Sequence, residues 1–434
     1  MTNANPMQFD ILIIGAGPAG LSAAQVAAQS GARVGLVDDN ILPGGQIWRQ
    51  GPAHPPKGPA RELLDALARY PNLTRLCGTR VVQPLAGKRL QVEDARQGHV
   101  LGYDRLILAT GARERFLPYP GWTLPGVTGA GGLQALIKGG TPVAGQRIVL
   151  AGSGPLLWAS AKTAQEQGAK IVAIVEQASH RSVARFARSL ALTPAKLVQA
   201  IRLRLGLRKT PYWRGAQVVA AHGDDRLRSV TVQRPQGSID LCCDRLACAY
   251  GLLPNIELAA ALGCASAPYA DTTAVQVDAW QHTTQPDVYA AGECTGVGGM
   301  ELSALEGRIA AHAALEQQDA ARRLFARRER YRDFSRRLHA AFALNPSLRA
   351  LPRDDTIFCR CEDVPHGELA THDSWRMAKL HTRCGMGPCQ GRICGGAAAF
   401  CFGWQPSNTR PPLSPTRIGT LADLAGTDAA TDAT

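Results

Sequence analysis

The chain has 434 residues, of which 45% are hydrophobic and 19% charged, and its formal net charge at pH 7 is +13. That length is enough for two or three globular domains, and no apolar run reaches the roughly 18 residues of a membrane-spanning helix. Because residues 1–9 lack the pattern of a secretory signal, we expect a cytoplasmic protein whose 12 cysteines are free thiols or metal ligands.

An apolar strand at 9–14 leads into the first glycine-rich turn, GAGPAG, and an alanine-rich helix follows at 21–30. The first glycine of such a turn makes a tight bend, the second lets the backbone approach a pyrophosphate, and the third allows close helix packing. A second strand at 33–37 ends in two acids that can bond ribose hydroxyls. The unit predicts a dinucleotide site formed by Gly15, Gly17, Pro18, Ala19, Gly20, Asp38 and Asp39.

Three further segments resemble motifs of flavoproteins with two dinucleotide-binding domains, in the thioredoxin-reductase-like branch. They are GGQ at 44–46, LILATGA at 106–112 and DVYAAGE at 287–293. That family usually has Asp where this chain has Glu293, which reaches one methylene further. The resemblance implies that the first unit binds FAD, with further contacts from Gly45, Gln46, Val82, Thr110, Gly111, Gly292 and Glu293.

A second strand–turn–helix unit begins at 147–150, and its second strand ends at Glu176. The flavoproteins that the chain resembles hold NAD(P)H at this place, and Glu176 would suit a ribose 2′-hydroxyl. The third glycine, however, is replaced by Leu157, whose branched side chain argues against a standard dinucleotide pose. We expect Gly152, Gly154 and Glu176 either to contact NAD(H) or another adenine nucleotide, or to remain from a lost site.

No Cys-x-x-Cys lies near either glycine-rich turn, which excludes a dithiol relay of the thioredoxin-reductase kind. The ten histidines are scattered, so the sequence offers no catalytic base.

Positive charge concentrates at 181–209 and in an arginine-rich helical pattern at 321–337. No nucleic-acid reader module is recognisable, so we expect no nucleic-acid partner. The second segment fits either a solvated helix face or a docking surface for a more acidic subunit.

The C-terminal part contains two close cysteine pairs, Cys359 with Cys361 and Cys389 with Cys394, among several glycines. Soft thiolates in this arrangement select an iron–sulfur cluster or zinc over hard cations. Cys384 stands as far before Cys389 as Cys394 stands after it, so either could complete the site. A four-cysteine zinc site remains the structural alternative.

The run TRCGMGPCQGRIC at 382–394 resembles the C-terminal module of the bacterioferritin-associated-ferredoxin (BFD) type. This module ends the large FAD subunits of opine oxidases, dye-linked proline and hydroxyproline dehydrogenases, and hydrogen cyanide synthase. The resemblance implies a [2Fe–2S] cluster on Cys359, Cys361, Cys389 and Cys394, with Cys384 as the spare thiol.

Because the resemblance covers nearly the whole chain, it implies an electron-transfer subunit of a heteromeric amino- or imino-acid dehydrogenase or oxidase. The implied partner is a D-amino-acid-oxidase-like FAD subunit, and electrons would pass on to a small ferredoxin-like subunit or to a quinone pool through a peripheral membrane link. A stand-alone NADH-dependent FAD/iron–sulfur reductase is a second interpretation. A non-catalytic scaffold that carries the cluster is a third.

The predicted fold class is α/β, a two-dinucleotide-binding-domain flavoprotein with a small helical BFD-like [2Fe–2S] domain. The expected FAD domain comprises 1–125 and 270–345, and a nucleotide-like Rossmann domain is inserted at 126–269. The cysteine domain is expected at 346–404. Residues 405–434 lose periodicity and end in Ala, Thr and Asp, so we expect a disordered tail.

Overall fold

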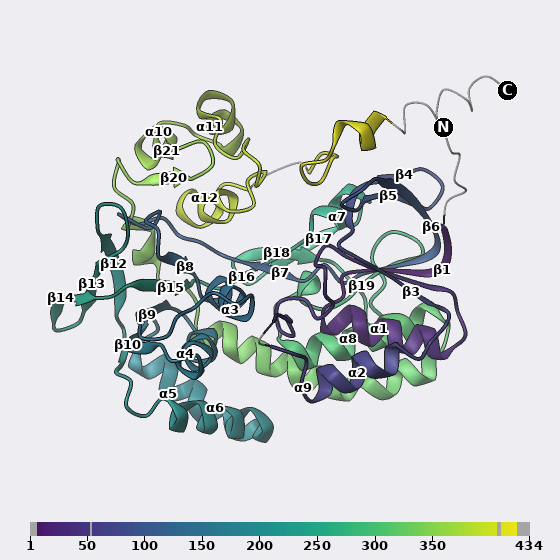
Figure 1. Cartoon of the computed structure of the whole chain (residues 1–434), viewed down its shortest axis with the longest axis horizontal. Helices are drawn as coiled ribbons and strands as arrows, with labels where there is room; N and C mark the ends of the chain where they lie inside the picture. The colour runs from purple at the N-terminus through teal and green to yellow at the C-terminus, as the bar shows by residue number, and fades with distance from the viewer. Residues whose placement is uncertain (1–6, 53, 406–408, 423–434) are drawn as a thin grey trace.

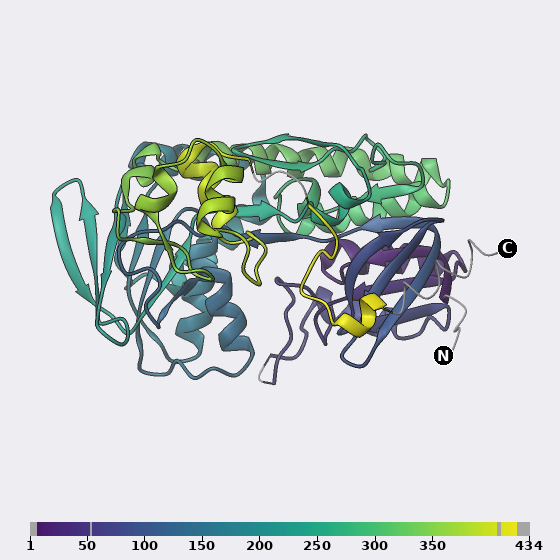
Figure 2. The same cartoon turned by 90° about the horizontal axis from the view of Figure 1, so that it is seen from above.

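The computed structural model describes residues 7–52, 54–405 and 409–422. Two α/β domains lie side by side, and a small helical module lies over the second of them (Figures 1 and 2). In the part of the chain that the structure describes, no helix is long and apolar enough to cross a membrane. The predicted α/β class with a small C-terminal domain is confirmed.

The first domain is built on a sheet with the strand order β3-β2-β1-β6-β5-β4, and β19 pairs with β6. Strands β1, β2, β3 and β19 run parallel to their neighbours, whereas β4, β5 and the start of β6 form an antiparallel extension. The bounds are β1 Met7–Ile14, β2 Val34–Asp38, β3 Leu73–Cys77, β4 Arg80–Leu85, β5 Arg89–Glu93, β6 Gly98–Leu108 and β19 Val288–Ala290.

Helices α1 (Pro18–Gln29), α2 (Pro59–Leu67), α8 (Met300–Ala314) and α9 (Gln318–Ala341) lie together below this sheet (Figure 1). Small residues let α1 and α8 approach closely: a Cβ atom on Gly307 would stand 2.0 Å from the carbonyl oxygen of Ala19. The sheet face and the helices share one apolar core, so the glycine-rich turn between β1 and α1 rests on a rigid support.

The second domain has a parallel sheet of order β11-β10-β9-β15-β8, with an antiparallel β12-β13-β14 sheet beside it. Its helices are α3 (Ala130–Lys138), α4 (Leu156–Glu166), α5 (His180–Ser189) and α6 (Pro194–Gly206). The strands are β8 Val127–Gly129, β9 Arg147–Gly152, β10 Lys170–Glu176, β11 Tyr212–Arg214, β12 Gln217–His222, β13 Ser229–Arg234, β14 Gly237–Cys242 and β15 Arg245–Ala249.

The side-chain cores place both expected boundaries of the inserted domain, at 125 and 269, too late in the sequence. Leu117 and Trp122 already belong to the core of the second domain, so the first crossing precedes the predicted position at 125. Leu258 and Cys264 belong to the core of the first domain, so the return crossing precedes 269. The two crossings pair as the short antiparallel strands β7 (Ala112–Glu114) and β16 (Leu252–Pro254). The return continues through α7 (Glu257–Ala261), β17 (Ser266–Tyr269) and β18 (Thr272–Val275).

The arginine-rich segment forms part of α9, and its cations divide between two environments. Arg328 is 3% exposed, Arg332 pairs with the buried carboxylate of Glu306 at 3.1 Å, and Arg337 donates to Thr193 of the second domain at 3.0 Å. These arginines hold α9 against both domains. The exposed ones lie at 322, 323, 327, 330 and 336.

The cysteine module contains β20 (Ile357–Cys359), β21 (Val364–Pro365), α10 (His366–Ala370), α11 (Trp375–Thr382) and α12 (Cys394–Phe402). It has a small core of its own around Leu369, Trp375 and Ala398. Phe400 of α12 packs into the core of the second domain together with Leu348, from the short helix η3 (Pro346–Ala350), so the module is fixed on that domain.

The expectation that 405–434 is disordered is wrong for residues 409–422. Leu413 is 7% exposed and packs into the core of the first domain. Thr420 is 3% exposed and donates to Glu93 of β5 at 2.7 Å. Low sequence periodicity misleads here because long-range contacts hold this segment, and only its last described residues, 418–422, are helical. Residues 406–408 and 423–434 lie outside the described residues.

Candidate functional site

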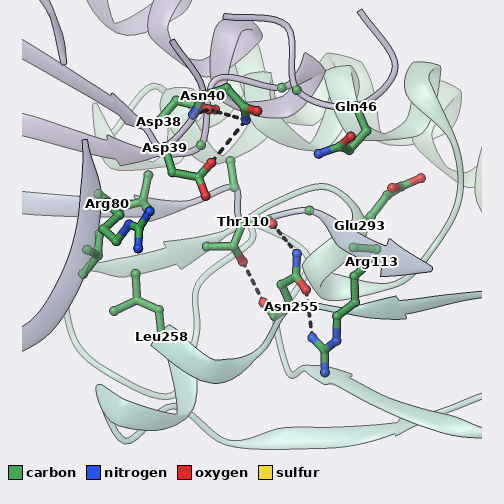
Figure 3. A pocket seen from close by; sticks show the side chains of 18 of the residues that line it. Asp38, Asp39, Asn40, Gln46, Arg80, Thr110, Arg113, Asn255, Leu258 and Glu293 are labelled. Carbon is green, nitrogen blue, oxygen red and sulfur yellow. Dashed lines mark hydrogen bonds between the residues drawn. The ribbon is translucent and has the colours of Figure 1, made fainter. Parts of the chain in front are cut away.

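A cavity of about 610 Å³ opens in the first domain at the carboxyl ends of its parallel strands. Ligands of open α/β sheets bind at this edge, because the turns that follow the strands converge there. Figure 3 shows side chains from distant segments pointing toward this cavity, among them Asp39, Gln46, Thr110 and Asn255.

The first glycine-rich turn allows three close backbone contacts. A Cβ atom on Gly15, which has φ +108°, would stand 2.2 Å from the Ala109 oxygen. A Cβ on Gly20 would stand 1.7 Å from the Gly15 oxygen, and one on Gly45 would stand 2.9 Å from the Cα of Gly17. Helix α1 then begins without a side-chain cap, so its first N–H groups remain free for an anion.

Asp38, the last residue of β2, and Asp39 lie at one end of the cavity (Figure 3). Asp38 is 7% exposed and accepts the backbone N–H groups of Ala16 at 2.5 Å and Asn40 at 2.8 Å. The Asn40 side chain also donates to both carboxylates, at 2.7 Å and 3.2 Å. Burial raises the pKa of Asp39, the neighbouring charge of Asp38 raises it further, and Arg80 opposes this. The pair is held where ribose hydroxyls would bind.

At the other end, Gln46, Thr110, Gly111 and Glu293 line the cavity. Burial raises the pKa of Glu293 to about 7, so this carboxyl holds a proton under mildly acidic conditions. Asn255 fixes this wall, because its side chain donates to the carbonyl of Thr110 at 2.9 Å while its backbone carbonyl accepts the Thr110 hydroxyl at 2.7 Å.

Of the residues predicted to contact FAD, three do not line the cavity. Gly20 and Gly292 instead allow tight packing; a Cβ on Gly292 would stand 2.8 Å from that of Ala19. The side chain of Val82 is fully buried in the core, and its neighbour Val81 lines the cavity. Successive strand residues point to opposite faces, so the prediction missed by one position. The residues that do line it are Gly15, Gly17, Pro18, Ala19, Asp38, Asp39, Gly45, Gln46, Thr110, Gly111 and Glu293.

The cavity fits FAD by its own features. It combines a tight glycine backbone, in which a Cβ on Gly15 or Gly45 would clash with neighbouring backbone atoms, a free helix N-terminus for the pyrophosphate, and a carboxylate pair for a ribose. Its volume also lies within the usual range for cofactor sites, about 300–1,000 Å³.

The cysteine module contributes directly to this cavity through Pro388, Cys389 and Arg392. Arg113 connects the two parts: its Nε donates to the carbonyl oxygen of Arg392 at 3.2 Å. The same guanidinium lies 2.8 Å from Glu257 and from the side-chain oxygen of Asn255. Arg113 and Asn255 lie in none of the recognised motifs, and Arg392 lies within the cysteine run at 382–394; only the tertiary fold brings the three together.

The four predicted cluster ligands line a second cavity, of about 160 Å³. They are Cys359, Cys361, Cys389 and Cys394. Phe116 and Trp122 of the second domain close one side, with their ring centroids 6.2 Å apart, and Arg360 and Ile393 complete the lining. Thiols are the donor set that iron–sulfur clusters and zinc require, so the residues present fit such a group.

The fifth thiol, Cys384, is fully buried beside this cavity. Its Sγ and those of Cys359 and Cys394 lie within 4.8 Å of one another. Hydrogen bonds from Cys384 and Cys394 lower the pKa of Cys359, and one from Cys394 lowers that of Cys389. The structure therefore brings all five thiols together, with Cys384 behind the cavity lining rather than in it.

The second glycine-rich turn contacts the chain's own linker after α9. The Ser153 hydroxyl donates to the Phe342 carbonyl at 2.8 Å, and a Cβ on Gly154 would stand 3.7 Å from the Phe342 ring. Gln177 donates to the Ala343 carbonyl at 3.0 Å and accepts the Asn345 N–H at 2.9 Å. Residues 342–345 therefore cover both the turn and the end of β10.

Glu176, predicted to contact a ribose, is fully buried. It accepts the backbone N–H groups of Gly154 and Ala178, each at 2.8 Å. Leu157 is also fully buried and packs in the core between α3, α4 and the second sheet, which explains how the turn accommodates a large third residue. The carboxylate thus stabilises the turn itself.

Comparisons with known proteins agree with this arrangement. Residues 9–318 match the family described as pyridine nucleotide-disulphide oxidoreductase. An opine oxidase subunit of Rhizobium meliloti (strain 1021) is 31% identical, over 96% of this chain and 99% of the relative. Hydrogen cyanide synthase subunit HcnB of Pseudomonas aeruginosa is 32% identical, over 89% of this chain and 91% of the relative.

Two solved structures share the fold. L-proline dehydrogenase from P. horikoshii matches with a TM-score of 0.67 and 18% identity, covering 97% of this chain and 81% of that chain. Thioredoxin reductase of Lactococcus lactis matches with a TM-score of 0.54 and 19% identity, covering 71% of this chain and 98% of that chain. The chain is an FAD-dependent oxidoreductase that belongs to the pyridine nucleotide-disulphide oxidoreductase family and, within it, to the group of HcnB and the opine oxidase subunit.

Proposed function

We propose that this chain is the FAD- and [2Fe–2S]-containing electron-transfer subunit of a heteromeric dehydrogenase or oxidase that acts on an amino or imino acid of the opine, proline or hydroxyproline type. The observation that carries the proposal is the position of Cys389, which lines both the 610 Å³ cavity and the 160 Å³ cysteine cavity. One residue thus joins the flavin site to the cluster site.

When bound, FAD accepts two electrons and can release them singly, and a [2Fe–2S] cluster carries one electron at a time. The chain's residues provide the rest. Gly15, Gly17 and the start of α1 bind the pyrophosphate, and Asp38 and Asp39 orient a ribose. The protonated carboxyl of Glu293 offers a hydrogen bond inside the cavity below about pH 7.

In the cysteine cavity, the four lining thiols hold the cluster as thiolates. Phe116 and Trp122 exclude water from one side of it, which matters because solvent exposure and hydrogen bonds to sulfur set a cluster's reduction potential. Trp122 is itself fixed, since its Nε1 donates to the carbonyl of Ile357 at 2.6 Å, next to the first ligand pair.

The substrate site is proposed to lie on a separate FAD subunit of the D-amino-acid-oxidase-like type. Support comes from two relatives whose names describe subunits, of opine oxidase and of hydrogen cyanide synthase. Further support is that the residues lining the 610 Å³ cavity are accounted for by FAD binding. The acceptor is proposed to be a small ferredoxin-like subunit or a quinone.

Purification of the chain alone and together with its partner subunit tests the proposal. The isolated chain should contain FAD, iron and acid-labile sulfide, and its flavin should not be reduced by amino or imino acids. Co-purification with an oxidase-like partner should restore substrate-dependent reduction. Oxidation of an amino acid by the isolated chain at the rate of the complex would refute the proposal that the substrate site lies on a separate subunit. A colourless, zinc-containing cysteine site would refute the electron relay.

A further inference from the structure

The C-terminal segment, residues 409–422, returns from the cysteine module to the first domain and lies along its antiparallel strands (Figure 2). Its fixed points are specific. The Leu413 N–H donates to the Val82 carbonyl at 2.8 Å, and the Gln91 side chain donates to the Thr420 carbonyl at 2.5 Å. Gly98 leaves room for Thr420, since a Cβ there would stand 2.8 Å from its methyl group.

A buried acid depends on the same segment. Glu93 is 8% exposed, and its Oε2 accepts the Thr420 hydroxyl at 2.7 Å and the Arg417 N–H at 3.1 Å. Although burial raises the pKa of Glu93, these hydrogen bonds lower it overall. Removal of the segment would leave this acid without two of its donors, so the contact is built into the domain rather than incidental.

Between these fixed points, the segment forms part of the wall of the FAD cavity through Leu413 and Ser414. Arginines anchor it on both sides: Arg392 donates to the Leu413 carbonyl, and Arg80 donates to the Pro415 carbonyl at 3.3 Å. Both arginines also line the cavity. The segment therefore crosses the cavity wall from the cysteine loop to the end that holds the acid pair.

The hydroxyl of Ser414 is buried and has no hydrogen-bond partner among residues 7–52, 54–405 and 409–422. Ser414 lines the cavity, so rotation of its side chain about the Cα–Cβ bond would bring this hydroxyl to a ligand there. FAD is rich in acceptors along its whole length.

We propose that the C-terminal segment is a part of the FAD site, in which Ser414 hydrogen-bonds to the bound cofactor, Leu413 packs against it, and the whole segment slows its release. This extends the site beyond the residues 9–318 that match the family. It requires FAD in the cavity but neither the partner subunit nor the iron–sulfur cluster.

FAD affinity tests the proposal directly. Four forms are compared: the full chain, a chain lacking 409–434, a chain lacking only 423–434, and Ser414→Ala in the full chain. FAD is removed and rebound, and the dissociation constant is measured from flavin fluorescence, with circular dichroism as a check on folding. We expect the 409–434 deletion to weaken binding at least tenfold and Ser414→Ala to weaken it about fivefold, the equivalent of one hydrogen bond.

The control deletion of 423–434 should bind FAD as the full chain does, and so should Ile418→Ala, because that side chain is 86% exposed. Full-strength FAD binding by a folded chain that lacks 409–434 would overturn the proposal. Should that deletion prevent folding, Ser414→Ala and Leu413→Ala decide: unchanged FAD affinity in both would overturn it. Because the readout is cofactor binding, failure here is distinct from failure of the proposed electron-transfer role.

Discussion

Arg113 donates a hydrogen bond from Nε to the backbone carbonyl of Arg392, at 3.2 Å, and so joins the first domain to the cysteine loop. Burial lowers the pKa of Arg113, and the 2.8 Å ion pair with Glu257 opposes this. The same guanidinium reaches the Asn255 side chain at 2.8 Å. Acceptors from two separate parts of the chain, residues 255–257 and residue 392, meet at one planar donor, which only arginine can serve.

Replacing Arg113 with alanine should therefore destabilise the protein by about 2–3 kcal/mol, because buried hydrogen bonds to a charged group are lost and Glu257 is left without its cation. Urea unfolding measures this. The control is Arg61→Ala, whose 3.5 Å ion pair with Asp65 is exposed and should contribute less than about 1 kcal/mol. Equal effects of the two substitutions would contradict the bridging role.

The cysteine variants should separate ligands from the spare thiol. Cys389→Ser and Cys359→Ser are expected to lose most bound iron and labile sulfide, because both sulfurs line the cavity. Cys384→Ser should keep both, since that thiol lies behind the lining. Cys401→Ser, outside the cavity, serves as the control. Loss of iron from Cys384→Ser together with retention of iron in Cys394→Ser would show that Cys384 is the ligand and Cys394 the spare thiol.

The sequence alone predicted those parts of the sites whose residues lie close together in the chain. The turn from Gly15 to Gly20 was predictable because strand, turn, helix and acid follow one another within one short stretch. The grouping of Cys359, Cys361, Cys389 and Cys394 was predictable because close pairs bring their sulfurs together locally, and all four line one cavity.

Contacts between distant segments were not predictable in this way. Asn255 carries no local signature, and the run at 382–394 does not indicate that Arg392 lines the cavity. Both residues reach it because the second domain returns early and the cysteine module folds back. Val82, an FAD contact implied by the resemblance, has its side chain in the core, and its neighbour Val81 lines the cavity instead. Leu413 lies in a segment with no periodicity at all.

The linker over the second glycine-rich turn predicts that NADH is not a donor. Mixing with NADH in the absence of oxygen should leave the flavin absorbance unchanged, because Phe342 and Ala343 cover the turn. Rapid bleaching of the flavin by NADH would contradict this and would favour the alternative of a stand-alone reductase.

Gln177 is the residue that holds this linker, through hydrogen bonds to Ser153, Ala343 and Asn345. Gln177→Ala should lower stability by about 1–3 kcal/mol and speed amide hydrogen exchange of Asn345, whose N–H it accepts. Gln167→Ala, at an exposed position after α4, is the matched control and should change neither. Unchanged exchange at Asn345 would show that Gln177 does not fix the linker.

Glu176 should make stability depend on pH. Burial raises its pKa from 4.5 to about 7, so between these values the folded chain keeps a proton that the unfolded chain has lost. Stability should fall as pH rises through this window, by up to about 3 kcal/mol from this residue. Glu176→Gln should flatten the slope measured by urea unfolding from pH 5 to 7.5, whereas exposed Glu166→Gln should not. An unchanged slope in Glu176→Gln would contradict the raised pKa.

Trp122 should protect the cysteine site from solvent. Its ring lines the 160 Å³ cavity, and its Nε1 donates to the Ile357 carbonyl at 2.6 Å. Trp122→Phe loses this hydrogen bond but keeps an aromatic ring, so it should cost about 1 kcal/mol and leave the site closed. Trp122→Ala removes the cover, and the visible absorbance of the cluster should then decay several-fold faster in air, since water and oxygen reach the sulfurs. Trp158 packs on Tyr212 at the far side of the second domain, so in the control Trp158→Ala the cluster absorbance should decay at the rate of the unaltered chain. The same unaltered rate in Trp122→Ala would show that Trp122 does not shield the site.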